Sequence, residues 1–242
     1  MENKKYDTEI LIEGCKKVGV TLSEKQIEQF LIYYEYLVEK NKVMNLTGIT
    51  EYEEVVLKHF VDSLSLTQAL DLKQYDTLLD LGTGAGFPGL PLKIAFPHLN
   101  VVLMDSLNKR INFLNEVIEK IECKNIVAVH ARAEEAARKK EYREQFDLCV
   151  SRAVANLSSL SEYCLPFVKK DGIFVSYKSM EIEEEINNSK KAVFLLGGKI
   201  KEKKEFYLPD SDIGRSFVLI QKEKSTPAKY PRKAGMPSKE PL

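Results

Sequence analysis

One segment of this chain restricts its possible folds more than any other. Residues 78–89 read Leu-Leu-Asp-Leu-Gly-Thr-Gly-Ala-Gly-Phe-Pro-Gly, an apolar run that leads into a glycine-rich turn. Glycines at alternate positions, Gly82, Gly84 and Gly86, let the backbone turn sharply and approach a ligand where a Cβ atom would collide. A buried strand followed by such a turn and a helix predicts a site for a nucleoside-containing cofactor.

Two classes of cofactor fit this glycine loop. The spacing Gly84-x-Gly86-x-x-Gly89 matches the fingerprint of dinucleotide-binding proteins. The spacing Asp80-x-Gly82-x-Gly84-x-Gly86 matches the loop with which methyltransferases hold S-adenosylmethionine. The glycines alone leave both classes open.

Pro88 and Asp80 favour S-adenosylmethionine. A dinucleotide places its pyrophosphate on free N–H groups at a helix N-terminus, and a proline there removes one of them. Proline is also common at the first helical position for structural reasons, so Pro88 discriminates modestly. The carboxylate of Asp80 would repel a pyrophosphate, but it can orient the loop or accept a hydrogen bond from the cationic methionine end of S-adenosylmethionine.

Composition indicates an ordinary globular protein. The chain has 242 residues, 44% of them hydrophobic, and its 36 basic and 36 acidic side chains cancel. Contact with nucleic acid therefore has to come from local patches of charge. The four cysteines are scattered without a C-x-x-C pair, so we expect neither disulfides nor a metal site. No apolar run reaches the roughly 18 residues that span a bilayer, and the polar start is unlike a signal peptide, so we expect a cytoplasmic protein without membrane contact.

The pattern of apolar residues divides the chain into three parts. Residues 1–70 read as a helical cap, in which Ser23 and Gln26 form a capping box. Residues 71–224 alternate short apolar strands with amphipathic helices, which predicts a doubly wound, mostly parallel α/β sheet. Its last two strands have no helix between them and suggest an antiparallel pair at one edge. We expect strands near residues 77–81, 100–104, 125–129, 146–150, 172–177, 200–207 and 215–221, and a helix over 181–195.

The third part, residues 225–242, is a basic tail rich in proline. It has no apolar period and should be extended or poorly ordered by itself. Arg232 and Lys233 in this tail are candidates for neutralising RNA phosphates. The alternative is that the basic residues are simply a solvated chain end.

Open parallel sheets bind ligands beyond the carboxyl ends of their strands, which directs attention to the residues after each strand. Asp105 follows the second strand, where an acid can meet a ribose hydroxyl or pair with the next helix. Ala133 and Glu134 follow the third strand and would flank an adenine, although Glu134 could equally be an N-terminal helix charge. Arg152 follows the fourth strand.

The residues around Arg152 also bear on the acceptor. Methyltransferases that modify exocyclic amines carry an Asn/Asp-Pro-Pro-aromatic segment at this place, and Ser151-Arg152-Ala153 lacks it. This absence favours an acceptor that is already nucleophilic, such as a purine N7, which has an in-plane lone pair and no proton to remove. Catalysis would then consist mainly of orientation, and no general base is expected.

Several stretches of the chain together resemble the RsmG family, also called GidB, of bacterial methyltransferases that modify guanine N7 in small-subunit ribosomal RNA. The resemblance covers nearly the whole chain. The stretches that carry it are Asn45-Leu46-Thr47, residues 59–64, the glycine loop, residues 105–110, Ser151-Arg152-Ala153 and the tail from Tyr230.

The resemblance implies a class I, Rossmann-like methyltransferase fold with an N-terminal helical cap. It implies S-adenosylmethionine as cofactor and assembled small-subunit 16S RNA as substrate. Lys178, after the fifth strand, becomes a candidate RNA contact. The cofactor contacts expected from the glycine loop and the resemblance are Gly82, Gly84, Gly86, Phe87, Asp105, Ala133, Glu134 and Arg152.

His59, Asp62 and Ser63 are spaced to share one helix face. With Asn45 and Thr47 this face could cover the cofactor and position the guanine, together with Arg152. The same residues could instead cap the N-terminal helices and fix them to the sheet. Both interpretations stay open at the level of sequence.

We therefore expect a monomeric enzyme that transfers the methyl group of S-adenosylmethionine to a guanine N7 in 16S ribosomal RNA, in the small subunit or an assembly intermediate. One alternative is an NAD-dependent oxidoreductase, which rests only on Gly84 to Gly89. The other is a non-catalytic ribosome-assembly factor that keeps the fold for RNA binding. The sequence does not identify the guanine, the particle or the residues that contact the base.

Overall fold

A computed structural model describes residues 6–152 and 155–242. Ala153, which belongs to one of the stretches singled out above, lies outside the described residues. The helices before the sheet are α1 (Thr8–Lys17), α2 (Glu24–Met44), α3 (Tyr52–Val55), the π-helix η1 (Val56–Val61), α4 (Asp62–Leu64) and the 3₁₀ turns η2 (Ser65–Gln68) and η3 (Leu72–Gln74). The strands are β1 (Thr77–Leu81), β2 (Asn100–Asp105), β3 (Ile126–His130), β4 (Phe146–Arg152), β5 (Val168–Lys178), β6 (Gly198–Tyr207) and β7 (Gly214–Lys222). The later helices are α5 (Gly89–Ala95), α6 (Asn108–Lys120), α7 (Ala133–Ala136), α8 (Leu157–Cys164), the 3₁₀ turn η4 (Leu165–Phe167), α9 (Glu183–Leu195) and α10 (Met236–Lys239).

The strands of the described chain form one seven-stranded sheet in the order β3-β2-β1-β4-β5-β7-β6. The first five strands run parallel, and β7 pairs antiparallel with both β5 and β6. The predicted parallel sheet with an antiparallel edge is therefore confirmed. The order reverses direction at β1, so the carboxyl ends of β1 and β4 flank the crevice in which such sheets bind ligands.

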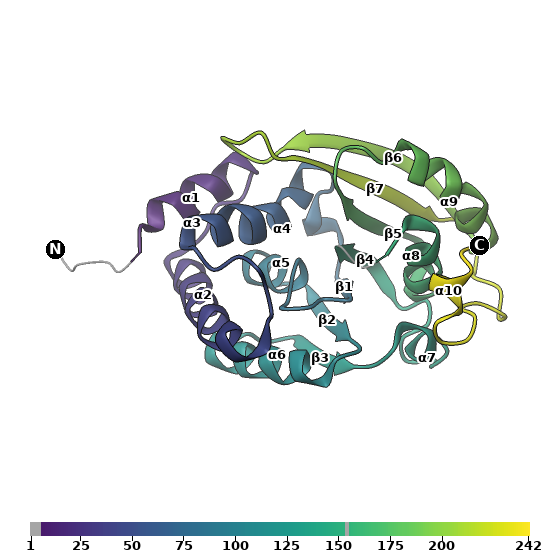
Figure 1. The fold of residues 1–242 in the computed structure, drawn as a ribbon, viewed down its shortest axis with the longest axis horizontal. Coiled ribbons are helices and arrows are strands. Elements are labelled where there is room, and N and C mark those ends of the chain that lie inside the picture. The colour runs from purple at the N-terminus through teal and green to yellow at the C-terminus, as the bar shows by residue number, and fades with distance from the viewer. Residues whose placement is uncertain (1–5, 153–154) are drawn as a thin grey trace.

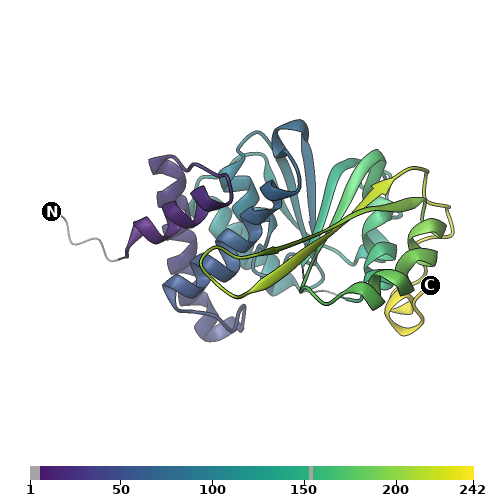
Figure 2. The ribbon, with the colours of Figure 1, turned by 90° about the horizontal axis from the view of Figure 1, so that it is seen from above.

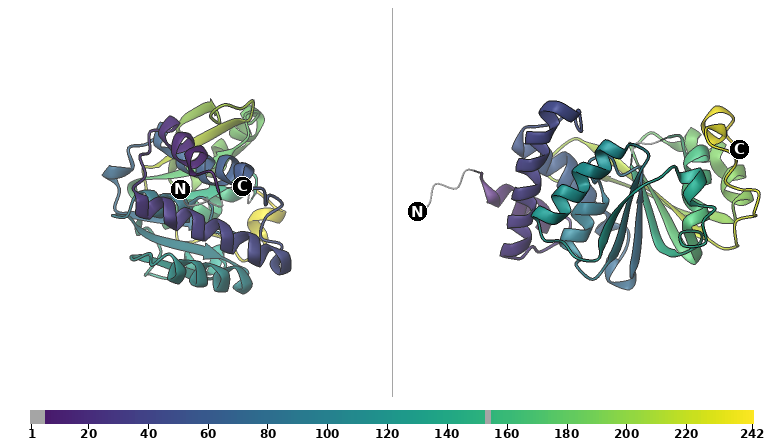
Figure 3. Two further views of the ribbon diagram at one scale, coloured as in Figure 1. Left: turned by 90° about the vertical axis from the view of Figure 1, so that its left-hand side faces the viewer. Right: turned by 90° about the horizontal axis from the view of Figure 1, so that it is seen from below.

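Helices cover both faces of the sheet (Figures 1 and 3). One face, with Leu78, Leu103 and Val150, packs against α5, α6 and the N-terminal helices. The other face, with Leu79 and Cys149, packs against α7, α8 and α9. Alternate residues of each strand thus enter different cores, which is why the strands read as continuous apolar runs.

The helical cap shares its core with the sheet. The Ser23–Gln26 capping box that starts α2 is present as predicted. Phe30 and Leu37 of α2 are fully buried in the cluster that also holds strand residues such as Leu148. The described part of the predicted cap, residues 6–70, is therefore packed into the same hydrophobic core as the sheet.

The β6–β7 hairpin extends the sheet toward the N-terminal helices (Figure 2). Near its tip Asp210 forms an ion pair with Lys17 of α1. Lys204 of β6 donates to the carbonyl oxygen of Gln68. The hairpin therefore ties the end of the sheet back to the cap.

The tail, expected to be extended or poorly ordered by itself, lies against α7 and α8 (Figure 1). Arg143 holds it by donating to the carbonyl oxygens of Thr226 at 2.8 Å and Tyr230 at 3.0 Å. Ser159 of α8 donates to the carbonyl oxygen of Pro237 at 2.6 Å. Tertiary hydrogen bonds supply the order that local periodicity does not.

Candidate active site

The glycine loop follows β1 as a run of left-handed backbone conformations. Gly82, Gly84 and Gly86 have φ angles of +72°, +62° and +105°, which L side chains rarely adopt. A Cβ atom on Gly84 would meet nothing within 4 Å, whereas one on Gly86 would lie 2.8 Å from the Tyr33 hydroxyl oxygen. Gly84 therefore leaves open space beside the loop, and Gly86 lets the loop pack against α2.

Asp80 holds the loop from beneath. Its Oδ2 accepts hydrogen bonds from the Thr83 hydroxyl and the Gly89 amide, each at 2.7 Å. Its Oδ1 is buried and has no hydrogen-bond partner among the residues that the structure describes. Burial raises the pKa of Asp80 to about 6. Of the two roles that the sequence suggested for this carboxylate, orientation of the loop is the one visible in the protein's own contacts.

Asp105, at the end of β2, is bonded to the same loop. Its Oδ2 accepts from the Gly84 amide at 3.0 Å and from Arg110 at 3.1 Å, and its Oδ1 accepts from the Leu107 amide at 2.9 Å. Asp105 is only 3% exposed. The side chain thus fixes the loop relative to the helix that follows, and contact with a ribose stays a prediction.

A cavity of about 450 Å³ opens beside this loop. We call it the loop cavity, and it is lined by Gly82, Asp105, Ala133 and Glu134, all predicted cofactor contacts. Glu134 is largely buried, and its Oε1 accepts a hydrogen bond at 2.9 Å from the Gly235 amide in the tail. The ends of three strands and the tail thus meet at one place.

A second cavity, of about 550 Å³, is lined by His59, Asp62, Arg152, Lys178 and Arg215, and we call it the arginine cavity. Asp62, only 2% exposed, accepts from Arg152 at 2.8 Å through one oxygen and from Arg215 at 3.0 Å through the other. One carboxylate therefore holds two guanidinium groups at the edge of this cavity.

Phe87 of the glycine loop contacts residues of the arginine cavity. The His59 ring stacks on it with centroids 4.5 Å apart, and the Arg152 guanidinium carbon lies 5.2 Å from its centroid. Burial, and then the positive charge of Arg152, lower the pKa of His59 to about 4. The His59 ring is therefore neutral at pH 7, and the loop and the arginine cavity meet at Phe87.

Comparison with known proteins identifies the family. Residues 26–213 match the family described as rRNA small subunit methyltransferase G. This chain belongs to that family. The ribosomal RNA small subunit methyltransferase G of Lachnoclostridium phytofermentans is 58% identical over 98% of both chains. The one of Bacillus subtilis is 49% identical over 95% of this chain and 96% of its own.

Solved structures of low sequence identity share the fold of this methyltransferase. A fibrillarin/Nop5p complex matches with a TM-score of 0.51 and 18% identity over 67% of this chain and 80% of that chain. The Methanococcus jannaschii fibrillarin pre-rRNA processing protein matches with a TM-score of 0.50 and 17% identity, over 64% and 70% of the two chains. These likenesses show the fold, which is the Rossmann-like fold of class I methyltransferases.

S-adenosylmethionine is the cofactor of this methyltransferase, and the residues present fit it. Gly84 leaves open space beside the loop, where a Cβ atom would meet nothing within 4 Å. The carboxylate of Asp80, buried directly beneath the loop, would repel a pyrophosphate placed on it. Membership of the family decides against the NAD-dependent oxidoreductase that Gly84 to Gly89 had left open.

The helical face predicted from His59, Asp62 and Ser63 is divided between two roles. His59 and Asp62 line the arginine cavity. Ser63 is fully buried, and its hydroxyl donates to the His59 carbonyl oxygen within the helix. The Thr47 hydroxyl lies 2.8 Å from Nε2 of His59, whereas Asn45 is exposed and ends α2 in a left-handed conformation. Asn45 is outside the described lining of both cavities.

The three candidate RNA contacts lie in different surroundings. Lys178 lines the arginine cavity and donates to Glu185 at 2.6 Å. Lys233 is exposed. Arg232 is bound to the fully buried Glu162, with Nε 3.0 Å from Oε1 and Nη2 2.7 Å from Oε2. The guanidinium of Arg232 is therefore engaged inside the protein and anchors the tail.

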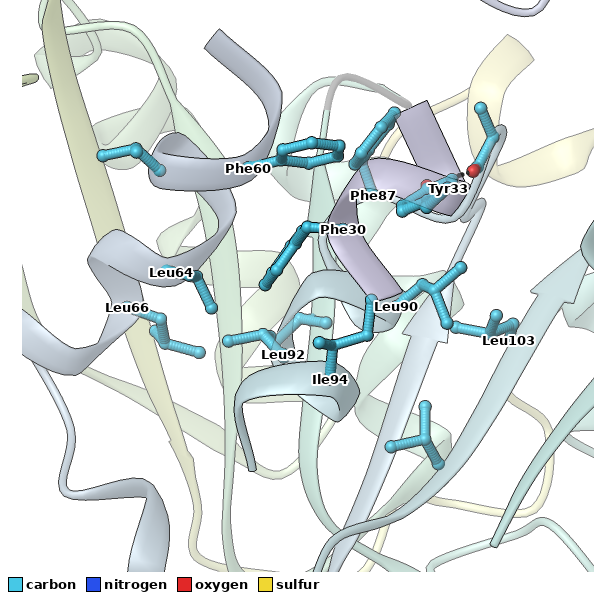
Figure 4. Close-up of a cluster of buried hydrophobic side chains, with 14 of the residues drawn as sticks. Phe30, Tyr33, Phe60, Leu64, Leu66, Phe87, Leu90, Leu92, Ile94 and Leu103 are labelled. Atoms are coloured by element: carbon cyan, nitrogen blue, oxygen red, sulfur yellow. Dashed lines mark hydrogen bonds between the residues drawn. The ribbon is translucent and has the colours of Figure 1, made fainter. Parts of the chain in front are cut away.

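Sequence reasoning missed several residues that shape the site. Tyr33 of α2 stacks on Phe87 with ring centroids 5.4 Å apart (Figure 4), and its hydroxyl donates to the Ala85 carbonyl oxygen. Arg215 enters the arginine cavity from β7. Tyr163 and Ser238 line the loop cavity. None of these residues carries a local sequence signal that marks it as part of a site.

The described residues hold no cluster of three potential metal ligands. Within the same residues, no helix combines the length and the apolar character that crossing a membrane requires. Cys149 and Cys164 are buried free thiols in the core behind the sheet. The candidate site therefore consists of the residues that line the loop cavity and the arginine cavity.

Proposed function

We propose that this chain transfers the methyl group of S-adenosylmethionine to N7 of a guanine in 16S ribosomal RNA. Its membership of the small-subunit rRNA methyltransferase family supports an RNA substrate. The missing Asn/Asp-Pro-Pro-aromatic segment supports a ring nitrogen as the acceptor. We propose further that it acts as a cytoplasmic monomer on the small subunit or its assembly intermediate.

The observation that carries this proposal is the contact between the glycine loop and the arginine cavity. Phe87 belongs to the loop, and both His59 and Arg152 pack on its ring. A base held in the arginine cavity would therefore lie next to the loop that holds the cofactor. Placing two reactants side by side in a fixed orientation is the main requirement of a direct transfer.

S-adenosylmethionine supplies a methyl group on a positively charged sulfur, which leaves with the electron pair of the broken bond. Guanine N7 brings its own lone pair, so the protein removes no proton. The lowered pKa of His59 leaves its ring neutral at pH 7. A neutral ring can stack beside a base without placing a positive charge next to it. Arg152, fixed by Asp62, can donate hydrogen bonds to polar groups at the acceptor's edge.

The charge around the arginine cavity suits RNA. Basic side chains outnumber carboxylates in its lining, although the protein as a whole has no net charge. Such a local excess attracts phosphates, and binding to it weakens as salt rises. The basic residues are Lys58, Arg152, Lys178 and Arg215, and the acidic ones are Asp62 and Glu185.

The first test is S-adenosylmethionine binding by calorimetry in wild type, Gly82→Asp and Gly19→Asp. Both glycines have positive φ, +72° and +79°, but only Gly82 lines the loop cavity. Backbone strain is therefore similar in the two variants, at about 1 kcal/mol. We expect Gly82→Asp to weaken binding at least about 100-fold, or some 2.7 kcal/mol, and Gly19→Asp to bind like wild type.

The second test is methyl transfer to small subunits and to free 16S RNA from cells that lack this enzyme. We expect a labelled methyl group at guanine N7, absent with Gly82→Asp. Cofactor binding without any transfer would favour the non-catalytic assembly factor. A methyl group on another atom would overturn the N7 acceptor, and binding of NADH instead of S-adenosylmethionine would overturn the whole proposal.

A further inference from the structure

The loop cavity is closed on one side by the tail. Gly235 and Ser238 line it, next to Tyr163 of α8. These tail residues belong to the segment from Tyr230 singled out above. One wall of the cavity is therefore built by the C-terminal tail.

An ion pair between the half-buried Arg232 and the buried Glu162 fastens this wall. Glu162 of α8 is fully buried, and it accepts hydrogen bonds from the side chain and, at 2.7 Å, from the backbone amide of Arg232. Glu162 is the neighbour of Tyr163 in the sequence. The attachment of the tail is therefore adjacent to the side chain that faces the cavity, and loss of one partner would leave a buried charge unpaired.

A second attachment joins the tail to a predicted cofactor contact. The Gly235 amide donates to Glu134 at 2.9 Å, and Gly235 has a φ of +81° with nothing within 4 Å of its Cβ position. The Ser238 hydroxyl lies 3.1 Å from the Gly235 carbonyl oxygen. Glu134, Gly235 and Ser238 thus form one bonded unit at the edge of the cavity.

We propose that residues 230–239 form the outer wall of the cofactor site, with Tyr163 and Ser238 contacting the adenosine end of S-adenosylmethionine. Arg232 is a positioning residue, because it holds this wall through Glu162 without lining the cavity. The inference rests on the proposed function only in taking S-adenosylmethionine as the ligand. If the cofactor contacts this wall, its binding should slow the local opening of residues 230–239.

The direct test is hydrogen exchange of the full chain with and without S-adenosylmethionine. Amides of residues 230–239 should exchange at least about tenfold more slowly with the cofactor bound, because opening the wall then requires its release. Helix α1, far from the cavity, serves as the internal reference and should not change. Cofactor binding with unchanged exchange in the tail would overturn the inference.

Variants test the same point through affinity. Arg232→Gln and Lys224→Gln each remove one positive charge, but Lys224 is exposed and lies outside the proposed wall. We expect Arg232→Gln to weaken cofactor binding about tenfold and to speed exchange in residues 230–239 even without cofactor, with Lys224→Gln within about twofold of wild type. Equal affinity of wild type and Arg232→Gln would contradict the positioning role.

Ser238→Ala provides a variant that leaves Glu162 paired. Loss of one hydrogen bond to the cofactor should weaken binding about three- to tenfold. If Arg232→Gln does not fold, Ser238→Ala and the exchange measurement still test whether residues 230–239 form a wall of the cofactor site. Absence of cofactor binding in the wild type would instead count against the proposed function, so the two failures can be told apart.

Discussion

At the scale of single residues, Phe87 shows how a loop side chain connects two parts of a site. Its ring is buried between Tyr33 of the cap, His59 of the helical segment and Arg152 of β4. The glycines around it adopt backbone conformations that ordinary residues avoid, whereas Phe87 supplies the surface on which the acceptor side is built. The glycines of the loop therefore shape the predicted cofactor side of the site, and Phe87 next to them shapes the acceptor side.

His59 gives a prediction at this scale. Its pKa is lowered to about 4 in the folded protein. Between about pH 6.5 and pH 4, His59 is therefore protonated in the unfolded chain but neutral in the folded protein. Stability should fall as pH drops from about 6.5 to 4, by about 3 kcal/mol in total from this residue. An NMR titration should place the His59 midpoint near pH 4, with the signal assigned by His59→Gln. A midpoint near 6.5 would show that the ring is solvated and not packed on Phe87.

At the scale of elements, the π-helix η1 places the acceptor side of the site. The sequence predicts that His59, Asp62 and Ser63 share one face of a helix, but residues 56–61 form the wider π turn, a feature frequent at functional sites. His59 lies within this turn, and Asp62 follows it directly. Asp62 then joins the helical segment to β4 and β7 through its two arginines.

Asp62→Asn tests this junction. It leaves two arginines facing each other without the carboxylate, and because both are partly exposed we expect a loss of about 2–3 kcal/mol in the free energy of unfolding, at the low end for buried pairs. Glu54→Gln is the matched control, since its ion pair with Lys58 is exposed and should contribute below about 0.5 kcal/mol. Chemical denaturation measures both. Equal effects would mean that Asp62 does not join these elements.

At the scale of the whole molecule, one hydrophobic core spans cap and sheet. Buried residues of α1 and α2, such as Leu11 and Phe30, belong to the same cluster as Val150 and Val175 of the sheet. The β6–β7 hairpin adds polar contacts to the cap at its far end. The cap therefore has no separate core to keep it folded when the sheet unfolds.

This arrangement predicts a single cooperative unfolding transition. Far-ultraviolet circular dichroism, which reports mainly helix, and near-ultraviolet signals of the tyrosines should give the same midpoint. S-adenosylmethionine at 100 times its Kd should stabilise the folded protein by about 2.7 kcal/mol and move both signals together. A first transition confined to helical signal would show instead that the cap unfolds by itself.

The sequence by itself determined the strands, the glycine loop and the capping box of α2, and its motifs identified the family. The structural features depend on local backbone preferences and on the alternation of apolar residues, which neighbours in the chain set. It also placed Gly82, Asp105, Ala133 and Glu134 at one edge of the sheet, because parallel strands end on the same side.

Only the tertiary structure decided which distant side chains meet. Arg215 reaches Asp62 across 153 positions, and Arg232 reaches Glu162 across 70. Nothing local distinguishes Arg232, half-buried and paired with Glu162, from the exposed Lys233 beside it. Packing on the two faces of one sheet brings segments that are distant in the sequence together. The ion pairs that form between these segments then fix the walls of both cavities.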